Sequence, residues 1–292
     1  MKRRLYQLDV FTRRPYRGNP IAVVTDADGL RPSQMQAIAR EMNLSETVFV
    51  QKPATNRALA RLRIFTTTAE LPLAGSAVVG AWHLLAELGV VPAQEGAVRV
   101  QQQTGAGLLP VEIFFEQGKP RLVTMTQKPA RFRPASLGRK DLAAALGLRP
   151  GDIDSRLRPE FVSTGIFNLL VPLASQAALG RLAPAAALLR KVLGRENVMA
   201  YCFAGKGRLV RARGMLPEGL REDPATGSAA GSLGAYLVRH GRVKLGQMLR
   251  ILQGVEMGRP SEIFVNVLRA GSQLTPRVSG AAVRVFEGYL EA

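Results

Sequence analysis

Hydrophobic and polar positions alternate along the first fifty residues in a way that predicts strands, a loop and one helix. Positions 5–12 alternate, 14–20 form a loop with two prolines and a glycine, and 21–26 are rich in β-branched residues. Apolar residues at helical spacing predict a helix over 31–42. A short polar turn then leads into a predicted strand over 47–50.

The pattern continues with few regular crossover helices. A strand is predicted over 59–67, a loop running into an apolar helix over 69–89, and a pair of strands over 97–115. Most of these strands are joined by turns. This layout predicts a mixed α+β fold and argues against a doubly wound nucleotide-binding fold.

An internal repeat relates the two halves of the chain. Residues 70–77 read ELPLAGSA and residues 222–229 read EDPATGSA, an offset of 222 − 70 = 152 positions. A basic strand region precedes each copy and an apolar helix follows it, which favours a repeat over a chance similarity of small-residue loops. The repeat predicts two similar domains, 1–118 and 119–292, joined by a segment rich in proline and charge. An alternative is that the last strand crosses back and pairs within the first domain.

Each copy of the repeat places a glycine and a serine where a helix is expected to begin. These residues are Gly75 and Ser76 in the first copy, and Gly227 and Ser228 in the second. A helix start beside a bare glycine can bind an anion, because its N–H groups and partial positive charge face outward. We therefore expect the two helix starts to receive a small carboxylate in a cleft between the domains. The alternative is that both are only helix caps.

The repeat also shows where the two halves differ. Adding 152 to Glu46 leads to Val198, and subtracting 152 from Asp223 leads to Leu71, so each half carries an acid that the other lacks. Both acids are predicted in loops or at strand entries, where catalytic groups tend to lie. A partly buried carboxylate there can have a pKa raised enough to exchange protons near neutrality. The alternative, two solvated loop acids, stays open at this point.

Composition restricts the function further. Hydrophobic residues make up 47% of the chain, enough for a substantial core, and the formal net charge is +18. The basic residues are scattered and aromatic residues are few, which favours a solvated arginine-rich surface over specific nucleic-acid binding. No apolar run has the length of a membrane span. The single cysteine, Cys202, excludes an internal disulfide and a two-thiol mechanism, and favours the cytoplasm. Clustered metal ligands are absent from the sequence, so no metal is expected.

Several long stretches carry a family resemblance. They are LDVFTRRPYRGNPIAVV, MNLSETVFV, RIFTTTAELPLAGSAVVGA, VSTG, REDPATGSAAGSLGAYL and QGVEMGRPSEIFV. With these motifs the chain resembles the phenazine-biosynthesis (PhzF-like) isomerase family over nearly its whole length. The resemblance implies a diaminopimelate-epimerase-like fold, in which each of two domains wraps an antiparallel barrel-like sheet around a central helix, with the active site between the domains. It also implies isomerisation without a cofactor, usually in a homodimer.

The resemblance also implies roles for individual residues. Glu46, in the SET motif, matches the family's general acid/base, and Asp223, in EDPATGS, matches an aspartate that helps to hold the substrate. Four further residues match positions that line the site: Ser45, Gly75, Gly227 and Ser228. One position departs from the pattern, because Ser76 stands where the family commonly has a substrate-contacting histidine. A non-catalytic protein that binds a small carboxylate is therefore the alternative to an isomerase.

Overall fold

The computed structural model describes residues 2–193, 198–216 and 222–292, and the chain divides into two compact units. The first unit runs from the N-terminus to Thr126 and also includes Ser279–Ala292, while the second is Gln127–Val278. Position 118, where we predicted the domain boundary, lies inside the first unit, in the turn Gln117–Gly118. Both residues of this turn have positive φ, as a two-residue hairpin turn requires. The strand after this turn stays in the first unit because it pairs with the strand before it.

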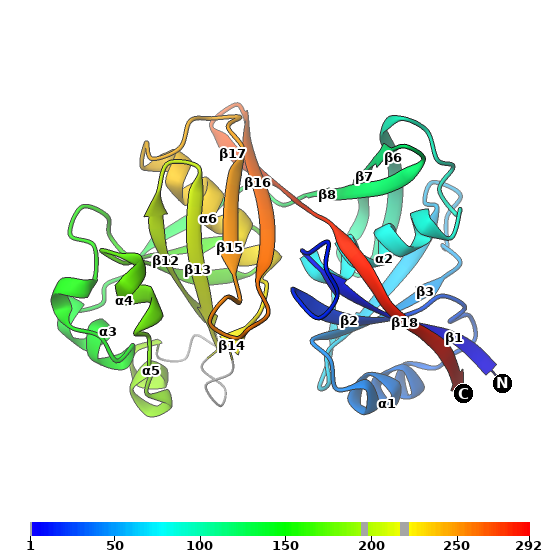
Figure 1. The fold of residues 1–292 in the computed structure, drawn as a ribbon, viewed down its shortest axis with the longest axis horizontal. Helices are drawn as coiled ribbons and strands as arrows, with labels where there is room; N and C mark the ends of the chain where they lie inside the picture. The colour runs from blue at the N-terminus through cyan, green and yellow to red at the C-terminus, as the bar shows by residue number, and fades with distance from the viewer. Residues whose placement is uncertain (1, 194–197, 217–221) are drawn as a thin grey trace. The chain divides into compact units, whose positions relative to one another are not determined.

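A strongly curved sheet forms the first unit (Figure 1). In order of pairing its strands are β18 (Ala282–Glu291), β1 (Lys2–Val10), β2 (Asn19–Val24), β3 (Glu46–Gln51), β4 (Ala60–Phe65), β6 (Gly96–Thr104), β7 (Gly107–Glu116) and β8 (Lys119–Thr126). The short strand β5 (Glu70–Leu71) pairs with the end of β4. The C-terminal strand therefore belongs to the same sheet as the N-terminal strand.

The central helix of this unit is α2 (Gly75–Glu87), which contacts six strands: β1, β2, β3, β7, β8 and β18. Residues Ser76–Ala86 are all buried, as expected for a helix that is apolar on every side. Gly80 permits close contact with the sheet, because a Cβ atom there would lie 2.4 Å from Cδ1 of Ile21. The remaining helix, α1 (Pro32–Met42), packs on the outer side of β3 and β4 and confirms the helix predicted over 31–42.

The second unit repeats this plan. In order of pairing its strands are β9 (Arg131–Pro134), β10 (Glu160–Ser163), β11 (Phe167–Pro172), β12 (Met199–Lys206), β13 (Leu209–Met215), β15 (Leu249–Gln253) and β16 (Ser261–Ala270). The short strand β14 (Glu222–Asp223) pairs with β13, and β17 (Gln273–Gly280) follows β16 along the chain. The central helix α6 (Gly227–Arg239) contacts β10, β11 and β16.

The short outer helices of the second unit are α3 (Arg139–Ala145), α4 (Gln176–Gly180) and α5 (Ala186–Leu193), with a 3₁₀ turn, η1, at Pro150–Asp152. They cover one side of the sheet with a separate apolar cluster that includes Leu142, Leu179, Leu189 and Val171. Among the described residues, no helix is both long enough and apolar enough to span a membrane.

Strand pairing confirms the two-domain pseudo-repeat. In both units the pairing sequence from the first strand onward is antiparallel, parallel, antiparallel, parallel, antiparallel. Strand β18 flanks β1 as β9 flanks β10, both antiparallel. The barrel-like sheets are thus mostly antiparallel, and their parallel pairs occur where helices join the strands, because parallel neighbours need a crossover connection.

Candidate active site

Glu46 is the first residue of β3, and its carboxylate is held by two side chains from distant parts of the first unit. The Oε2 atom of Glu46 accepts hydrogen bonds from Nδ2 of Asn19 at 3.1 Å and from Oγ of Ser76 at 2.9 Å. Asn19 is oriented in turn by Ser45, whose Oγ donates to Oδ1 of Asn19 at 2.7 Å. Four residues from three segments therefore form one polar network.

Burial makes this network rigid while leaving the acid partly accessible. Asn19 is 1% exposed and Ser76 is 3% exposed, whereas Glu46 and Ser45 are half-buried. Hydrogen bonds to a charged group contribute about 1.5–3 kcal/mol each when their partners are shielded from water. The arrangement orients one carboxylate oxygen of Glu46, which is the preparation that a positioned general acid/base needs.

The position of Asn19 depends on the glycine before it. Gly18 has φ +65°, and a Cβ atom at this residue would lie 2.1 Å from the carbonyl oxygen of Val10. Only glycine fits such a close approach in the left-handed region. The chain can therefore turn back tightly, so that Asn19 starts β2 opposite Val10 and beside the parallel strand that carries Glu46.

Ser76 is the second residue of α2, and its hydroxyl group is directed at Glu46. We predicted this residue as a substrate contact at the position of the family's histidine. A serine hydroxyl can donate one hydrogen bond and does not titrate near neutral pH. In this chain the position therefore orients the carboxylate of Glu46 rather than supplying a second ionisable group.

Asp223 is the second residue of β14 and is held by a different network in the second unit. Its Oδ2 atom accepts a hydrogen bond from Oγ1 of Thr226 at 2.6 Å, and its backbone oxygen accepts from Nε2 of Gln253 at 2.7 Å. The Oε1 atom of Gln253 accepts from the hydroxyl group of Tyr201 at 2.8 Å and from the backbone N–H of Thr226 at 3.0 Å. Gln253 is completely buried, so this support is fixed.

The surroundings of Asp223 change its acidity. Burial disfavours the ionised carboxylate and raises the pKa of Asp223 from 3.8 to about 6, although the hydrogen bond from Thr226 acts in the opposite direction. A carboxyl group with this pKa is partly protonated in mildly acidic solution and ionised at neutral pH. It can therefore either donate to or accept from a polar group of a ligand.

Each unit contains an equivalent ion pair, and this pair explains the first acid of each repeat. Arg63 contacts Glu70 through two hydrogen bonds, of 2.8 and 2.7 Å, and Arg213 contacts Glu222 through two, of 2.9 and 2.7 Å. Arg213 also donates to the backbone oxygens of two residues of the outer layer. Because the pair occurs in both halves, Glu70 and Glu222 support the fold, and the difference between the halves lies at the next residue.

The strand register corrects one pairing that we drew from the 152-residue offset. Thr47 and Ala200 correspond, because each pairs with the last residue of the neighbouring strand, β4 or β13. The counterpart of Glu46 is therefore Met199 and not Val198. Loops between the repeats differ in length, and this shifts the offset by one residue here. Met199 is buried and apolar, so the asymmetry remains.

The two glycine-serine pairs stand at the helix starts, as the sequence suggested. Gly75 begins α2 and Gly227 begins α6, and both helices have 13 residues. The first N–H groups of an α-helix lack partners within the helix and can face an anion. Ser228 is half-buried at the second position of α6. The structure thus places Ser45, Glu46, Gly75 and Ser76 in the first unit and Asp223, Gly227 and Ser228 in the second.

Each histidine lies close to an acid outside the two networks. His83 lies 3.6 Å from Glu87 on the same helix, and His240 lies 3.1 Å from Glu160. Burial raises the pKa of the Cys202 thiol to about 12, so the single cysteine is not a nucleophile at neutral pH. Within the described ranges, no group of three or more His, Cys, Asp or Glu side chains is placed to hold a metal ion.

Sequence reasoning missed three residues whose side chains form hydrogen bonds directly with Glu46 or Asp223: Asn19, Thr226 and Gln253. All three lie inside the stretches that carry the family resemblance. Their amide and hydroxyl side chains give no chemical signal on their own, because such residues are equally common in turns and caps. Only the hydrogen bonds to Glu46 and Asp223 reveal them.

Two similar domains, each with a barrel-like sheet around a central helix, are the architecture of the diaminopimelate-epimerase-like class of isomerases and epimerases. The sequence model of one family in this class, described as phenazine biosynthesis-like protein (PhzC-PhzF), matches residues 8–288. The chain belongs to this family and is an isomerase.

Curated relatives agree with this placement. Trans-2,3-dihydro-3-hydroxyanthranilate isomerase of Pseudomonas chlororaphis is 40% identical over 287 residues, which cover 97% of each chain. The enzyme of the same name from Pseudomonas fluorescens is 41% identical with the same coverage. The chain is therefore similar to these enzymes from end to end.

Solved structures share the fold. A phenazine biosynthesis protein of the PhzF family from Bacillus anthracis has a TM-score of 0.88 at 27% identity and covers all of both chains. A protein described as a predicted epimerase from Pseudomonas aeruginosa has a TM-score of 0.84 at 32% identity, with 99% of each chain covered. A probable proline racemase from Agrobacterium radiobacter, at 15% identity and a TM-score of 0.69, shares the fold.

Proposed function

We propose that this protein is a cofactor-independent isomerase that moves a proton on a small, unsaturated carboxylic acid, with Glu46 as the general acid/base. The observation that carries the proposal is the orientation of the Glu46 carboxylate by Asn19 and Ser76. A glutamate with only a structural role does not require two buried donors on the same carboxylate oxygen. The corresponding position in the second unit has no acid.

The reaction needs one base that can also act as an acid. Glu46 would take a proton from one carbon of the substrate and return it at another, so that a double bond moves and no hydrogen is gained or lost. Asn19 and Ser76 would keep the carboxylate in place during both steps. Positioning of this kind supplies much of the rate enhancement when no cofactor takes part.

The second unit would bind the polar groups of the substrate. We propose that the substrate lies between the two units, with its carboxylate at the N–H groups of the helix starts that begin at Gly75 and Gly227. Asp223 would contact a hydroxyl or amino group of the substrate, because its pKa of about 6 leaves it mainly ionised and able to accept a hydrogen bond at neutral pH. This assignment agrees with the names of the curated relatives, whose substrate is a cyclic hydroxy acid with an amino group.

The second candidate is a member of this isomerase family that keeps the site for a small carboxylate but has lost turnover, and one observation favours it. Ser76 occupies the position of the family's histidine and cannot exchange protons at neutral pH. If turnover requires an ionisable group at this position, the protein would hold its ligand without converting it. The ligand would then raise the melting temperature of the protein and would itself be recovered chemically unchanged.

The test combines a substrate search with a single variant. Small-molecule extracts are incubated in D₂O with the wild type and with Glu46→Gln, and mass spectrometry follows compounds that gain deuterium. We expect the wild type to label or convert at least one carboxylic acid and Glu46→Gln to lose nearly all of this exchange. The control is Glu41→Gln, which removes the same charge from an exposed residue of α1 and should retain full exchange.

The possible outcomes separate the two candidates. Equal deuterium uptake by the wild type and Glu46→Gln would contradict the role of Glu46. A compound that raises the melting temperature of the wild type but never changes mass or gains deuterium would favour the non-catalytic candidate.

A further inference from the structure

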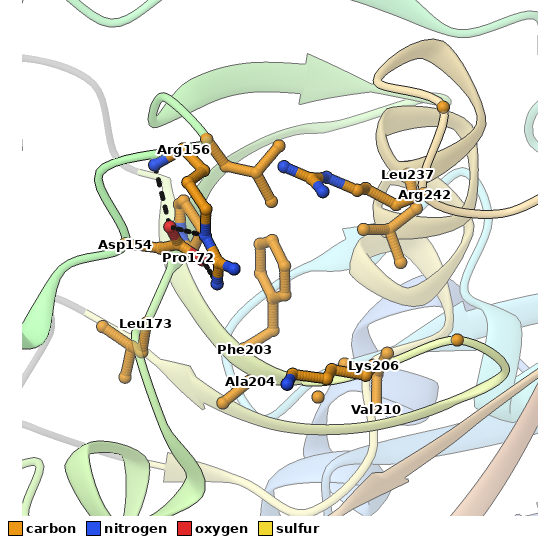
Figure 2. Close-up of a pocket in the computed structure, with 14 residues that line it drawn as sticks. Asp154, Arg156, Pro172, Leu173, Phe203, Ala204, Lys206, Val210, Leu237 and Arg242 are labelled. Atoms are coloured by element: carbon orange, nitrogen blue, oxygen red, sulfur yellow. Dashed lines mark hydrogen bonds and ion pairs between the residues drawn. The ribbon is translucent and has the colours of Figure 1, made fainter.

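A cavity of about 300 Å³ lies in the second unit, next to the hairpin that joins β12 to β13, and it contains no residue of the candidate active site. Its apolar lining includes Phe203, Val210 and Leu237, and its basic lining consists of Arg156, Lys206 and Arg242. Figure 2 shows the ring of Phe203 in the middle of the cavity, with these three basic side chains arranged around it. Phe203 is held by an edge contact with Tyr236, at 5.7 Å between ring centroids.

The charge of the lining is positive even after its internal ion pair is taken into account. Asp154 is the one acid of the lining, and Arg156 donates two side-chain hydrogen bonds to its carboxylate, of 3.1 and 2.9 Å. This pairing keeps the pKa of Asp154 below its ordinary value. Lys206 and Arg242 make no ion pair with any other residue that the structure describes. The lining therefore carries three positive charges and one negative charge, and Arg242, although it forms no ion pair with Asp154, also helps to lower the pKa of this acid.

The first unit provides an internal control for this cavity. Gly241 follows α6 as Gly89 follows α2, both with positive φ, and the next residue donates a backbone hydrogen bond to the helix in each case. That next residue is Arg242 in the second unit and Val90 in the first. The fold therefore places no demand for a basic side chain at this point.

The same control applies to the aromatic ring. The register of β12 with β13 and of β3 with β4 aligns Phe203 with Val50. The ring and the guanidinium group of Arg242 are thus both features of one unit only. Residues that differ between two copies of one fold are not required by that fold. Where such residues line the same cavity, they are candidates for a role in ligand binding.

We propose that this cavity binds a small organic anion in which a flat apolar ring carries a carboxylate group. The volume is at the lower end of the range for small-molecule sites, and the combination of apolar walls with a few placed charges is typical of them. The ring of the ligand would lie against Phe203, and its carboxylate would contact Lys206 and Arg242. This site is separate from the active site and does not depend on the function proposed for Glu46.

Benzoate is the probe for the test, with benzamide and inorganic phosphate as its neutral and ring-free counterparts. Methyl NMR spectra of the full-length protein are recorded during titration, and the signals of Val210, Leu173 and Leu237 report on the cavity. We expect benzoate to shift these signals in a saturable manner, and benzamide and phosphate to bind more weakly. The double variant Lys206→Ala/Arg242→Val should weaken benzoate binding about tenfold, since each exposed charge contributes roughly a factor of two to five.

Two further variants make the result specific. Arg269→Val removes one charge from an exposed position on β16 outside the cavity and should bind benzoate as the wild type does. Glu46→Gln should also leave the shifts at Val210, Leu173 and Leu237 unchanged, which separates this proposal from that for the active site. The proposal is overturned if benzoate causes no saturable shift at the cavity, if benzamide or phosphate binds equally well, or if the double variant retains wild-type affinity.

Discussion

The hydroxyl group of Ser76 donates a hydrogen bond of 2.9 Å to the Oε2 atom of Glu46. The two residues are 30 positions apart and come from different elements, the start of α2 and the start of β3. This contact joins the glycine-serine helix start to the only acid of the first half that the repeat singles out. It also shows what a serine does at a position where the family commonly has a histidine.

Removal of this hydroxyl group should reduce activity more than stability. Ser76→Ala deprives the Glu46 carboxylate of one donor, and a hydrogen bond to a charged group contributes about 1.5–3 kcal/mol, so we expect kcat/KM to fall roughly tenfold to a hundredfold. The measurement is steady-state turnover of the substrate identified by the deuterium screen. Ser232→Ala, which removes a buried hydroxyl group from α6, is the control, and equal losses in both variants would contradict a specific role for Ser76.

Asn19 should act as a positioning residue for Glu46. Asn19→Asp keeps the size of the side chain but replaces the donor to Glu46 with a second carboxylate, which repels the first. We expect kcat to fall with a smaller change in KM, and Asn19→Asp to be less active than Asn19→Ala. Kinetics of the two variants, with circular dichroism to verify folding, provide the measurement. Unchanged kcat in Asn19→Asp would rule out this role.

The stability of the protein should depend on pH through Asp223. Its pKa is about 6 in the folded chain and 3.8 as the ordinary value, so between these two values the folded state binds more protons than the unfolded state. Stability attributable to this group is therefore greatest below pH 4 and decreases as the pH rises to 6, by an amount on the order of 2–3 kcal/mol. Asp223→Asn, which cannot ionise, should remove this decrease.

Urea denaturation at several pH values between 4 and 7 measures this effect. The control is Asp141→Asn, which replaces an exposed aspartate in the first turn of α3 and should follow the pH dependence of the wild type. Parallel curves for the wild type and Asp223→Asn would show that the carboxyl group of Asp223 is not desolvated.

The two ion pairs of the repeat should differ in their contribution to stability. Arg213 is 9% exposed, pairs with Glu222 and also donates to the backbone oxygens of the outer helical layer, so Arg213→Met should cost about 3–5 kcal/mol. Arg63→Met should cost only about 1 kcal/mol, because the side chain of its partner Glu70 is 41% exposed. Chemical denaturation of both variants compares the pairs directly, and equal losses would contradict the prediction.

Much of the architecture could be predicted from the sequence. The repeat of ELPLAGSA in EDPATGSA located both central helices, because glycine and serine before an apolar run are local signals that act within one turn of the helix. The sequence also showed that each half has one acid, Glu46 or Asp223, without an acidic counterpart in the other half. The exact counterpart of Glu46 was not, since an offset cannot detect the loops that shift the register to Met199.

The sequence by itself determined that the chain has two similar halves and where their central helices begin. It also determined that Glu46 is an acid found only in the first half and Asp223 an acid found only in the second. These properties depend on residue type and spacing over short segments, so they can be inferred from the linear sequence. The tertiary structure alone decided that Asn19 and Ser76 hold Glu46, that Gln253 supports Asp223, and that Phe203 and Arg242 share a cavity. Such contacts join segments tens of residues apart, and they arise from strand register and from the packing of helices on sheets, which no local pattern specifies.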